Sequence, residues 1–303
     1  MKVLFFGYSQ MGYRAVELLA ERGDDVPAVV THRDDPRENR WYKTPAEAAA
    51  AHGLPVHYAE DLGRDGVTAL AERVAPDLVL SAFYRDLLPA PVLASARLAA
   101  LNLHPSLLPA YRGRAPINWV LVNGERETGV TLHHMVARAD AGDIVAQRAI
   151  PIAPRETALS LYLKTEEAGV ELLREALPRV AAGTAPRLPQ DASRASVFGR
   201  RRPEDGRIDW AWPAERIDRL VRAVAPPWPG AFAEVEGRRI EIHAGEPAEP
   251  LPPGTAPGTV RRAPDRLLVA AGDRWFRIDA GEGLESLGAS AAGASVSGAV
   301  LQA

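Results

Sequence analysis

Three polar residues in the first half of the chain have the types and the spacing needed for group transfer. Asn102 and His104 alternate along an apolar segment, and in a β-strand this spacing places both side chains on one face of the sheet. An amide can stabilise a developing oxyanion, and an imidazole can move a proton. Asp140 lies in a glycine-bearing loop between two predicted strands, where it can raise the pKa of the imidazole and fix its orientation. The trio indicates acyl transfer to an amine, although a purely structural His104 fits the strand position equally well.

Two other patterns point away from cofactor or metal chemistry. Gly7 and Gly12 follow the first predicted strand, but their spacing differs from the G-x-G-x-x-G of dinucleotide-binding folds. We therefore expect a tight turn at Gly7 and no NAD. His133 and His134 are neighbours on a predicted strand, so their side chains point to opposite faces, and no second cluster of ligands accompanies them. We expect structural roles for this pair and no metal site.

The order of the apolar segments predicts the scaffold that positions the trio. Over about residues 1–185, short apolar runs alternate with longer helical stretches, as in repeated β–α units around a parallel sheet. Thr44-Pro45-Ala46-Glu47 is a capping box that starts a helix ending at His52-Gly53. The clearest strands are Lys2–Phe6, Val26–Thr31, Leu78–Ala82 and Leu98–Leu103, with two more between Thr128 and Ala149 and helices at Met11–Arg22 and Ala158–Ala182. We predict a Rossmann-like, mostly parallel α/β sheet with the trio at the carboxyl ends of its strands.

A change of pattern predicts a second domain. Gly183–Arg207 has scattered Gly, Pro, Ser and Arg without a sustained period, which is typical of a linker. A helix over Pro213–Val224 is followed by predicted strands at Phe232–Val235, Arg239–His243, Val260–Arg261, Leu267–Ala270 and Trp275–Asp279. This pattern indicates a small OB-like β-barrel, and the prolines between Pro247 and Pro257 predict a stiff loop within it. We predict a catalytic domain at residues 1–188, a linker at 189–207 and the OB-like domain at 208–303, whose last residues, 289–303, are too poor in bulky side chains to place.

Composition narrows the classes of function. The chain has 303 residues, a formal net charge of −3 and no cysteine. The lack of a positive net charge disfavours generic nucleic-acid binding, and the lack of cysteine excludes disulfides and cysteine-ligated metal centres. The apolar run at the N-terminus is too short for a signal peptide, and no segment approaches the length of a membrane helix. We expect a cytoplasmic protein that does not insert into membranes.

These motifs together resemble the 10-formyltetrahydrofolate-dependent formyltransferases. The resemblance rests on Asn102-x-His104-x-Ser106-Leu107-Leu108-Pro109, Arg112-Gly113, Gly129-Val130-Thr131 and Asp140-x-Gly142-Asp143, and it continues through Ile208-Asp209-Trp210, Arg222-Ala223-Val224 and Pro227-Trp228-Pro229-Gly230-Ala231-Phe232. Within that family, the chain looks closest to the UDP-4-amino-4-deoxy-L-arabinose formyltransferases, whose product serves lipid A modification. This likeness rests on Phe83-Tyr84-Arg85, the run from Tyr111 to Glu125 and Phe198-Gly199-Arg200-Arg201.

The resemblance implies a role for each site residue. Asn102 would stabilise the tetrahedral transition state, His104 would transfer the proton, and Asp140 would raise the pKa of His104. The co-substrate 10-formyltetrahydrofolate would lie against the backbone of Asp86, Leu87 and Leu88 and of Val136, Ala137, Arg138, Ala139 and Asp140, with Arg114 reaching it. Candidate residues for the nucleotide amino sugar are Ser9, Asn118, Arg200 and Arg201.

The loops around the site select the acceptor, so a formyltransferase acting on another amino sugar or small amine is one alternative. Two rival functions also remain open at this point. Methionyl-tRNA formyltransferase would share the fold, the co-substrate and the trio, and it should carry a basic loop after the second strand. Here the span from Arg33 to Lys43 mixes charges of both signs, which makes it a poor phosphate clamp. Arg200-Arg201-Arg202 could meet either tRNA or the diphosphate of a nucleotide sugar, and the preceding Phe198-Gly199 favours the sugar. An inactive folate- or nucleotide-binding module is the second rival, and the intact trio disfavours it.

Overall fold

The computed structural model describes residues 1–36, 39–235, 238–263 and 266–285, and the chain divides into two compact units. The first unit contains Met1–Pro116, Glu127–Ile152 and Tyr162–Gly199, and the second contains Ile117–Arg126, Ala153–Leu161 and the chain from Arg200. The units therefore interleave along the sequence. The segment that the sequence identifies as a linker is folded into the first unit as far as Gly199. The tail at 289–303 lies outside the described residues.

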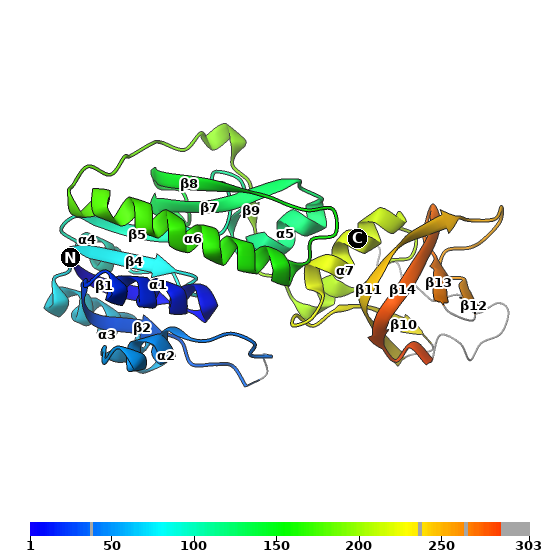
Figure 1. Ribbon diagram of the computed structural model, residues 1–303, viewed down its shortest axis with the longest axis horizontal. Coiled ribbons are helices and arrows are strands. Elements are labelled where there is room, and N and C mark those ends of the chain that lie inside the picture. The colour runs from blue at the N-terminus through cyan, green and yellow to red at the C-terminus, as the bar shows by residue number, and fades with distance from the viewer. Residues whose placement is uncertain (37–38, 236–237, 264–265, 286–303) are drawn as a thin grey trace. The chain divides into compact units, whose positions relative to one another are not determined.

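The first unit is built on a seven-stranded sheet in the order β3-β2-β1-β4-β5-β7-β8 (Figure 1). Its strands are β1 (Lys2–Gly7), β2 (Asp25–Thr31), β3 (Val56–Tyr58), β4 (Leu78–Ala82), β5 (Ala99–His104), β7 (Glu127–His134) and β8 (Ile144–Pro151). The first five strands of that order pair in parallel, and β7 and β8 pair antiparallel. The expected mostly parallel, Rossmann-like sheet is confirmed. The order reverses between β1 and β4, which is the switch point where such sheets bind ligands.

Helices cover both faces of this sheet. They are α1 (Ser9–Glu21), α2 (Pro45–Ala51), α3 (Ala59–Val74), α4 (Ala90–Ala94) and the first-unit part of α6 (Ala158–Ala181). Val67 of α3 and Val92 of α4 pack with Leu4, Phe6 and Val79 in one buried cluster. On the other face α6 crosses the sheet beside α1 (Figure 1), and the apolar strand residues are buried from both sides. This burial explains why the strands form near-continuous hydrophobic runs in the sequence.

The local sequence signals for these elements agree closely with the structure. The Leu78–Ala82 strand has the predicted bounds. The capping box before α2 is present, since the Thr44 side chain accepts from the Glu47 amide and the Glu47 side chain accepts from the Thr44 amide. β5 begins one residue later than predicted and continues to His104. That extension keeps Asn102 and His104 in one regular strand and therefore on one face.

The second unit contains the small antiparallel sheet expected for the C-terminal domain. Helix α7 (Ala214–Val224) accompanies a five-stranded sheet in the order β10-β11-β14-β13-β12. Its strands are β10 (Ala231–Val235), β11 (Arg238–Pro250), β12 (Val260–Ala263), β13 (Arg266–Ala270) and β14 (Arg274–Glu282), and α5 (Pro116–Asn123) also lies largely in this unit. The antiparallel pairing confirms the small C-terminal β domain.

The expected proline loop is shorter than predicted: Pro252, Pro253 and Pro257 lie in the loop between β11 and β12, but the expectation is wrong for the first two prolines. Pro247 and Pro250 belong to β11, opposite Phe276 and Arg274 of β14, and not to a stiff loop. A proline lacks the N–H that a strand donates, so it is tolerated where the ladder is irregular. The pairing of β11 with β14 shifts register between Pro247 and Pro250, which is such a place. In the part of the chain that the structure describes, no helix is long and apolar enough to cross a membrane.

Candidate active site

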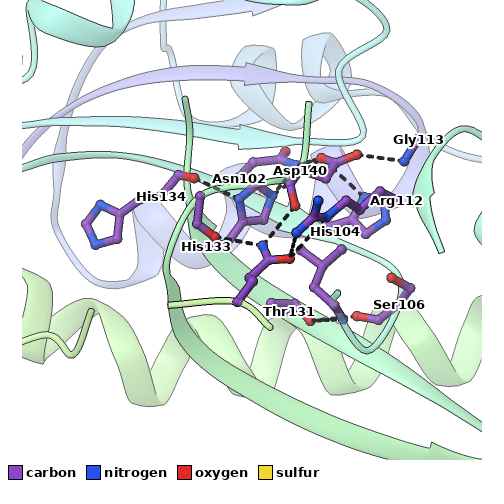
Figure 2. Close-up of polar contacts among 12 residues, drawn as sticks. Asn102, His104, Ser106, Arg112, Gly113, Thr131, His133, His134 and Asp140 are labelled. Atoms are coloured by element: carbon purple, nitrogen blue, oxygen red, sulfur yellow. Dashed lines mark hydrogen bonds and ion pairs between the residues drawn. The ribbon is translucent and has the colours of Figure 1, made fainter. Parts of the chain in front are cut away.

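The predicted trio comes together at the carboxyl end of β5. Asn102 and His104 project from the same face of this strand, and the antiparallel neighbour β7 places His133 opposite Asn102. The loop between β7 and β8 brings Asp140 to the same place (Figure 2). Asp140 Oδ1 lies 3.6 Å from His104 Nδ1 and 3.4 Å from Asn102 Nδ2. The amide, the imidazole and the carboxylate are therefore close enough to act on one reacting group.

The Asp140 carboxylate is held by the neighbouring loop of β6 (Arg112–Gly113). The backbone N–H of Gly113 donates to Asp140 Oδ2 at 2.8 Å, which leaves Oδ1 directed at Asn102 and His104. A Cβ on Gly113 would lie 2.3 Å from the carbonyl oxygen of Phe198, so only glycine permits this close approach. The first unit therefore uses a backbone donor to orient the carboxylate.

His133 belongs to the site, which corrects the structural role expected for it. Its Nδ1 lies 2.8 Å from the carbonyl oxygen of His134, and a carbonyl only accepts, so Nδ1 carries the hydrogen. In the neutral ring Nε2 then accepts from Asn102 Nδ2 at 3.2 Å, and it lies 3.5 Å from Asp140 Oδ1. Because both neighbours accept, the amide nitrogen of Asn102 must face them. His134 points the other way, as the alternation predicts (Figure 2).

The hydrogen bond of His104 decides which of its nitrogens can take a proton. His104 Nε2 lies 2.8 Å from the carbonyl oxygen of Tyr111, so Nε2 is the protonated nitrogen of the neutral ring. The free lone pair is on Nδ1, the nitrogen that faces Asp140. A proton taken up by Nδ1 would place a cationic imidazolium beside a carboxylate. His104 as a whole is 4% exposed, so water screens this interaction little.

Burial, and not the charge of Asp140, decides whether the pKa of His104 is raised or lowered. Desolvation of the imidazolium lowers the pKa of His104 below its usual value, although the charge of Asp140 acts in the opposite direction. The expected raising effect of Asp140 is present, but the net shift is downward. Burial also acts to raise the pKa of Asp140. The charge of His104, the nearby ring of His133 and the hydrogen bond from the Gly113 N–H outweigh that effect, so the carboxyl is ionised well below its usual range. At neutral pH the site holds a neutral imidazole beside a carboxylate.

Unusual backbone conformations gather at this end of the sheet. Left-handed φ values occur at Ser9, the first residue of α1, and at four non-glycine residues in the loops that follow or adjoin β4, β6 and β7: Phe83, Tyr111, Ala115 and Asp140. Such conformations cost of order 1–3 kcal/mol each and persist where the surrounding structure enforces them, which is frequent at functional sites. Their shared location supports the assignment of this edge as the active site.

The residues expected to contact folate lie in two irregular loops of the first unit. Asp86, Leu87 and Leu88 follow β4, and the stretch from Val136 to Asp140, which includes Ala137, Arg138 and Ala139, follows β7. Leu87 is 70% and Val136 is 46% exposed, although large apolar side chains are usually covered. Arg114 donates to the carbonyl oxygen of Arg85 and so joins the β6 loop to the loop after β4. Exposed apolar side chains of this kind suit a flat, partly apolar ligand.

The candidate acceptor residues are divided between the units. Ser9 is 8% exposed in the first unit, and its Oγ hydrogen-bonds to the hydroxyl of Tyr162 at 2.6 Å. Asn118 is 7% exposed in the second unit, where its Nδ2 donates to the carbonyl oxygen of Ala223. Arg201 lies over the ring of Trp119 in the same unit, and Arg200 is exposed. Among the described residues, no group of three or more His, Asp or Glu side chains is arranged to hold a metal ion.

Sequence reasoning missed the contribution of residues 190–198. Phe198, in β9 (Val197–Phe198), pairs beside Gly113 of β6, and its ring stacks on Tyr111 at 4.7 Å between centroids. The backbone N–H of Tyr111 donates to the Ser196 hydroxyl at 2.9 Å. The available signal was the likeness of Phe198-Gly199 to the sugar enzymes, which placed a family motif inside the predicted linker.

Comparison with family models identifies both parts of the chain. Residues 1–177 match the formyl transferase model, and residues 201–285 match the model of the formyl transferase C-terminal domain. The chain belongs to the formyl transferase family. This family assignment confirms the resemblance seen in the motifs and makes the protein an enzyme that transfers a formyl group. The closer likeness to the UDP-4-amino-4-deoxy-L-arabinose enzymes stays a prediction.

Solved structures share this fold, and two of those described here are N-formyltransferases. A variant of HypX from Aquifex aeolicus is 25% identical with a TM-score of 0.65 over 92% of this chain, which spans 43% of the HypX chain. An N-formyltransferase from Helicobacter canadensis, in complex with folinic acid and dTDP-3-aminofucose, is 19% identical with a TM-score of 0.70, covering 93% and 99% of the two chains. A sugar N-formyltransferase from a Shewanella species is 19% identical with a TM-score of 0.64, covering 80% of this chain and 97% of its own.

Proposed function

We propose that the protein transfers the formyl group of 10-formyltetrahydrofolate to the amine of a nucleotide-linked amino sugar. The observation that carries the proposal is that Asp140 Oδ1 lies 3.4 Å from the Asn102 amide and 3.6 Å from the His104 ring, at the carboxyl end of the strand that carries both. The complexes of the Helicobacter enzyme with folinic acid and an amino sugar nucleotide support both substrate classes.

The reaction forms one C–N bond and breaks another. The neutral amine of the acceptor attacks the formyl carbon, and the carbonyl oxygen takes the negative charge of the tetrahedral intermediate. The Asn102 amide stabilises that oxygen with the hydrogen that it now donates to Asp140. That bond is 3.4 Å long and is the longer of the two that the amide makes. Collapse of the intermediate then breaks the bond to N10 of the folate, and no covalent enzyme intermediate is needed.

His104 carries the proton from the incoming to the leaving nitrogen. Its Nδ1 has a free lone pair because Nε2 donates to Tyr111, and burial keeps the ring neutral at neutral pH. After Nδ1 takes the proton of the attacking amine, the ionised Asp140 stabilises the imidazolium. The same proton then moves to the leaving N10, so the enzyme returns to its starting state.

The folate lies against the two exposed loops in this proposal. Leu87 and Val136 contact its ring system, while backbone groups of Asp86 to Leu88 and of Val136 to Asp140 fix its orientation and Arg114 approaches its anionic part. Leu87→Asp should weaken binding of 5-formyltetrahydrofolate measured by calorimetry. Leu163→Asp is the matched control because Leu163 is 50% exposed on α6, and its affinity should be unchanged. Equal affinity of both variants would contradict this placement.

The proposed acceptor is UDP-4-amino-4-deoxy-L-arabinose, with Ser9, Asn118, Arg200 and Arg201 as candidate contacts. Arginine guanidinium groups suit the diphosphate of such a substrate. The deciding experiment measures formyl transfer from 10-formyltetrahydrofolate to this UDP sugar, to dTDP-3-aminofucose and to methionyl-tRNA in parallel. Turnover of the UDP sugar alone supports the full proposal, and turnover of the dTDP sugar alone keeps the class but changes the acceptor. Turnover of the tRNA alone would overturn the amino-sugar assignment.

A further inference from the structure

One glutamine outside the trio makes four hydrogen bonds beside the catalytic carboxylate. Gln190 Nε2 donates to the carbonyl oxygen of Asp140 at 2.8 Å and to that of Gly142 at 2.7 Å. Its Oε1 accepts from Nε of Arg112 at 3.1 Å and from Nη2 of the same side chain at 2.6 Å. Both hydrogens of the amide and both lone pairs of its oxygen are therefore used. A fully satisfied side chain of this kind is held in one orientation.

The four bonds connect the loop that carries Asp140 to the strand that orients it. The loop is under constraint, since Asp140 has a φ of 53° and a Cβ on Gly142 would lie 2.0 Å from the carbonyl oxygen of His134. Arg112 belongs to β6 and is 3% exposed, and the next residue, Gly113, donates to the Asp140 carboxylate. Gln190 thus fixes the backbone of the loop against the strand whose amide fixes the side chain of Asp140.

We propose that Gln190 is a positioning residue that sets the distance between Asp140 and His104, an inference that rests on the proposed formyl transfer. Gln190 touches neither His104 nor Asn102 in the described contacts, so it acts through the Asp140 loop. It lies between the two matched ranges, 1–177 and 201–285, in a segment that the sequence identifies as a linker. The connection between the two domains would then be part of the catalytic apparatus.

The test is Gln190→Met, which keeps the length of the side chain and removes all four bonds. The pKa of His104 is measured by NMR of histidine-labelled protein without substrate, and kcat is measured with the best acceptor. His104 is faced by Asp140 and His133, and Asp140 is faced in turn by Arg112, which Arg138 also faces. When Asp140 moves away, the His104 pKa should fall further, and kcat should drop roughly tenfold to a hundredfold while KM changes little.

Two further variants separate positioning from loss of hydrogen bonds in general. Gln147→Met is the matched control, because Gln147 Nε2 also donates to two acceptors, the Leu108 carbonyl and the Thr131 hydroxyl, but touches neither Asp140 nor Arg112. It should leave the His104 pKa unchanged. Asp140→Asn removes the charge itself and sets the size of the largest expected shift. Gln190→Met should shift the pKa in the same direction by a smaller amount.

Each outcome decides the proposal. An unchanged His104 pKa in Gln190→Met, or the same shift in Gln147→Met, would overturn it, because a merely structural glutamine lowers stability without moving that pKa. If Gln190→Met does not fold, Gln190→Glu is the second variant. It keeps the acceptors for the buried Arg112 and loses only the bonds to the loop. An undiminished kcat in that variant would overturn the proposal. Failure of formyl transfer in the wild type would remove the proposed function but leave the NMR result as the test of positioning.

Discussion

Truncation of Asn102 tests the oxyanion role most directly. Asn102→Ala removes the amide nitrogen that lies 3.2 Å from His133 Nε2 and 3.4 Å from Asp140 Oδ1. Loss of one oxyanion donor typically raises the barrier by about 2.7–4 kcal/mol, so kcat should fall roughly 100–1,000-fold. KM for the folate should change much less, because the lost bond is stronger in the transition state than in the ground state.

The same substitution has an effect on stability that must be measured separately. It leaves His133 Nε2 and Asp140 Oδ1 without their amide donor, which costs about 1–3 kcal/mol when such groups stay buried. Asn102 is only partly buried, so water can replace part of this bonding and the lower end of that range applies. The free energy of unfolding in urea gives this cost, and kcat is then measured at a temperature where the variant is fully folded.

Ser81→Ala is the control for a disturbance of the same strands. Ser81 pairs with Asn102 across β4 and β5 and is 5% exposed, but nothing in the mechanism uses its hydroxyl. Its turnover should match that of the wild type within about twofold, as for substitutions outside the reacting groups. Formyl transfer is followed as production of tetrahydrofolate under saturating substrates. A folded Asn102→Ala protein with near-normal kcat would refute the oxyanion role.

Two further predictions concern stability. Burial lowers the pKa of His104, so the unfolded chain takes up this proton before the folded one as the pH falls through about 6.5. The free energy of unfolding of the wild type should therefore decrease as the pH is lowered from about 7.5 to about 5.5. In His104→Asn, the free energy of unfolding in urea should fall less over the same pH range. An equal dependence on pH in the two proteins would contradict the neutral state assigned to the His104 ring. Gly113→Ala should lower Tm more than Gly183→Ala: both glycines have positive φ, but only a Cβ at Gly113 meets the carbonyl oxygen of Phe198, at 2.3 Å. An equal fall in Tm for the two variants would contradict this prediction, because it would mean that β6 and β9 separate easily to make room for the Cβ.

Much of the fold could be read from local signals. Apolar runs of strand length, the capping box at Thr44 and the alternation of Asn102 with His104 depend only on residues close in sequence, and each is present in the structure. The prolines of β11 were misread because local sequence does not show where a ladder shifts register. Whether a proline is tolerated in a strand depends on which partner atoms face it, and those belong to a distant strand.

The sequence by itself determined the trio and the family, because residue types and their spacing are enough to define a motif. The tertiary structure decided how those residues work. Strand pairing brought His133 opposite Asn102, which fixes the orientation of the amide, and burial gave His104 a lowered pKa despite the nearby carboxylate. It also brought Gln190, fifty residues along the chain, onto the loop of Asp140. Such contacts depend on pairing, burial and desolvation across distant segments, and no local pattern encodes them.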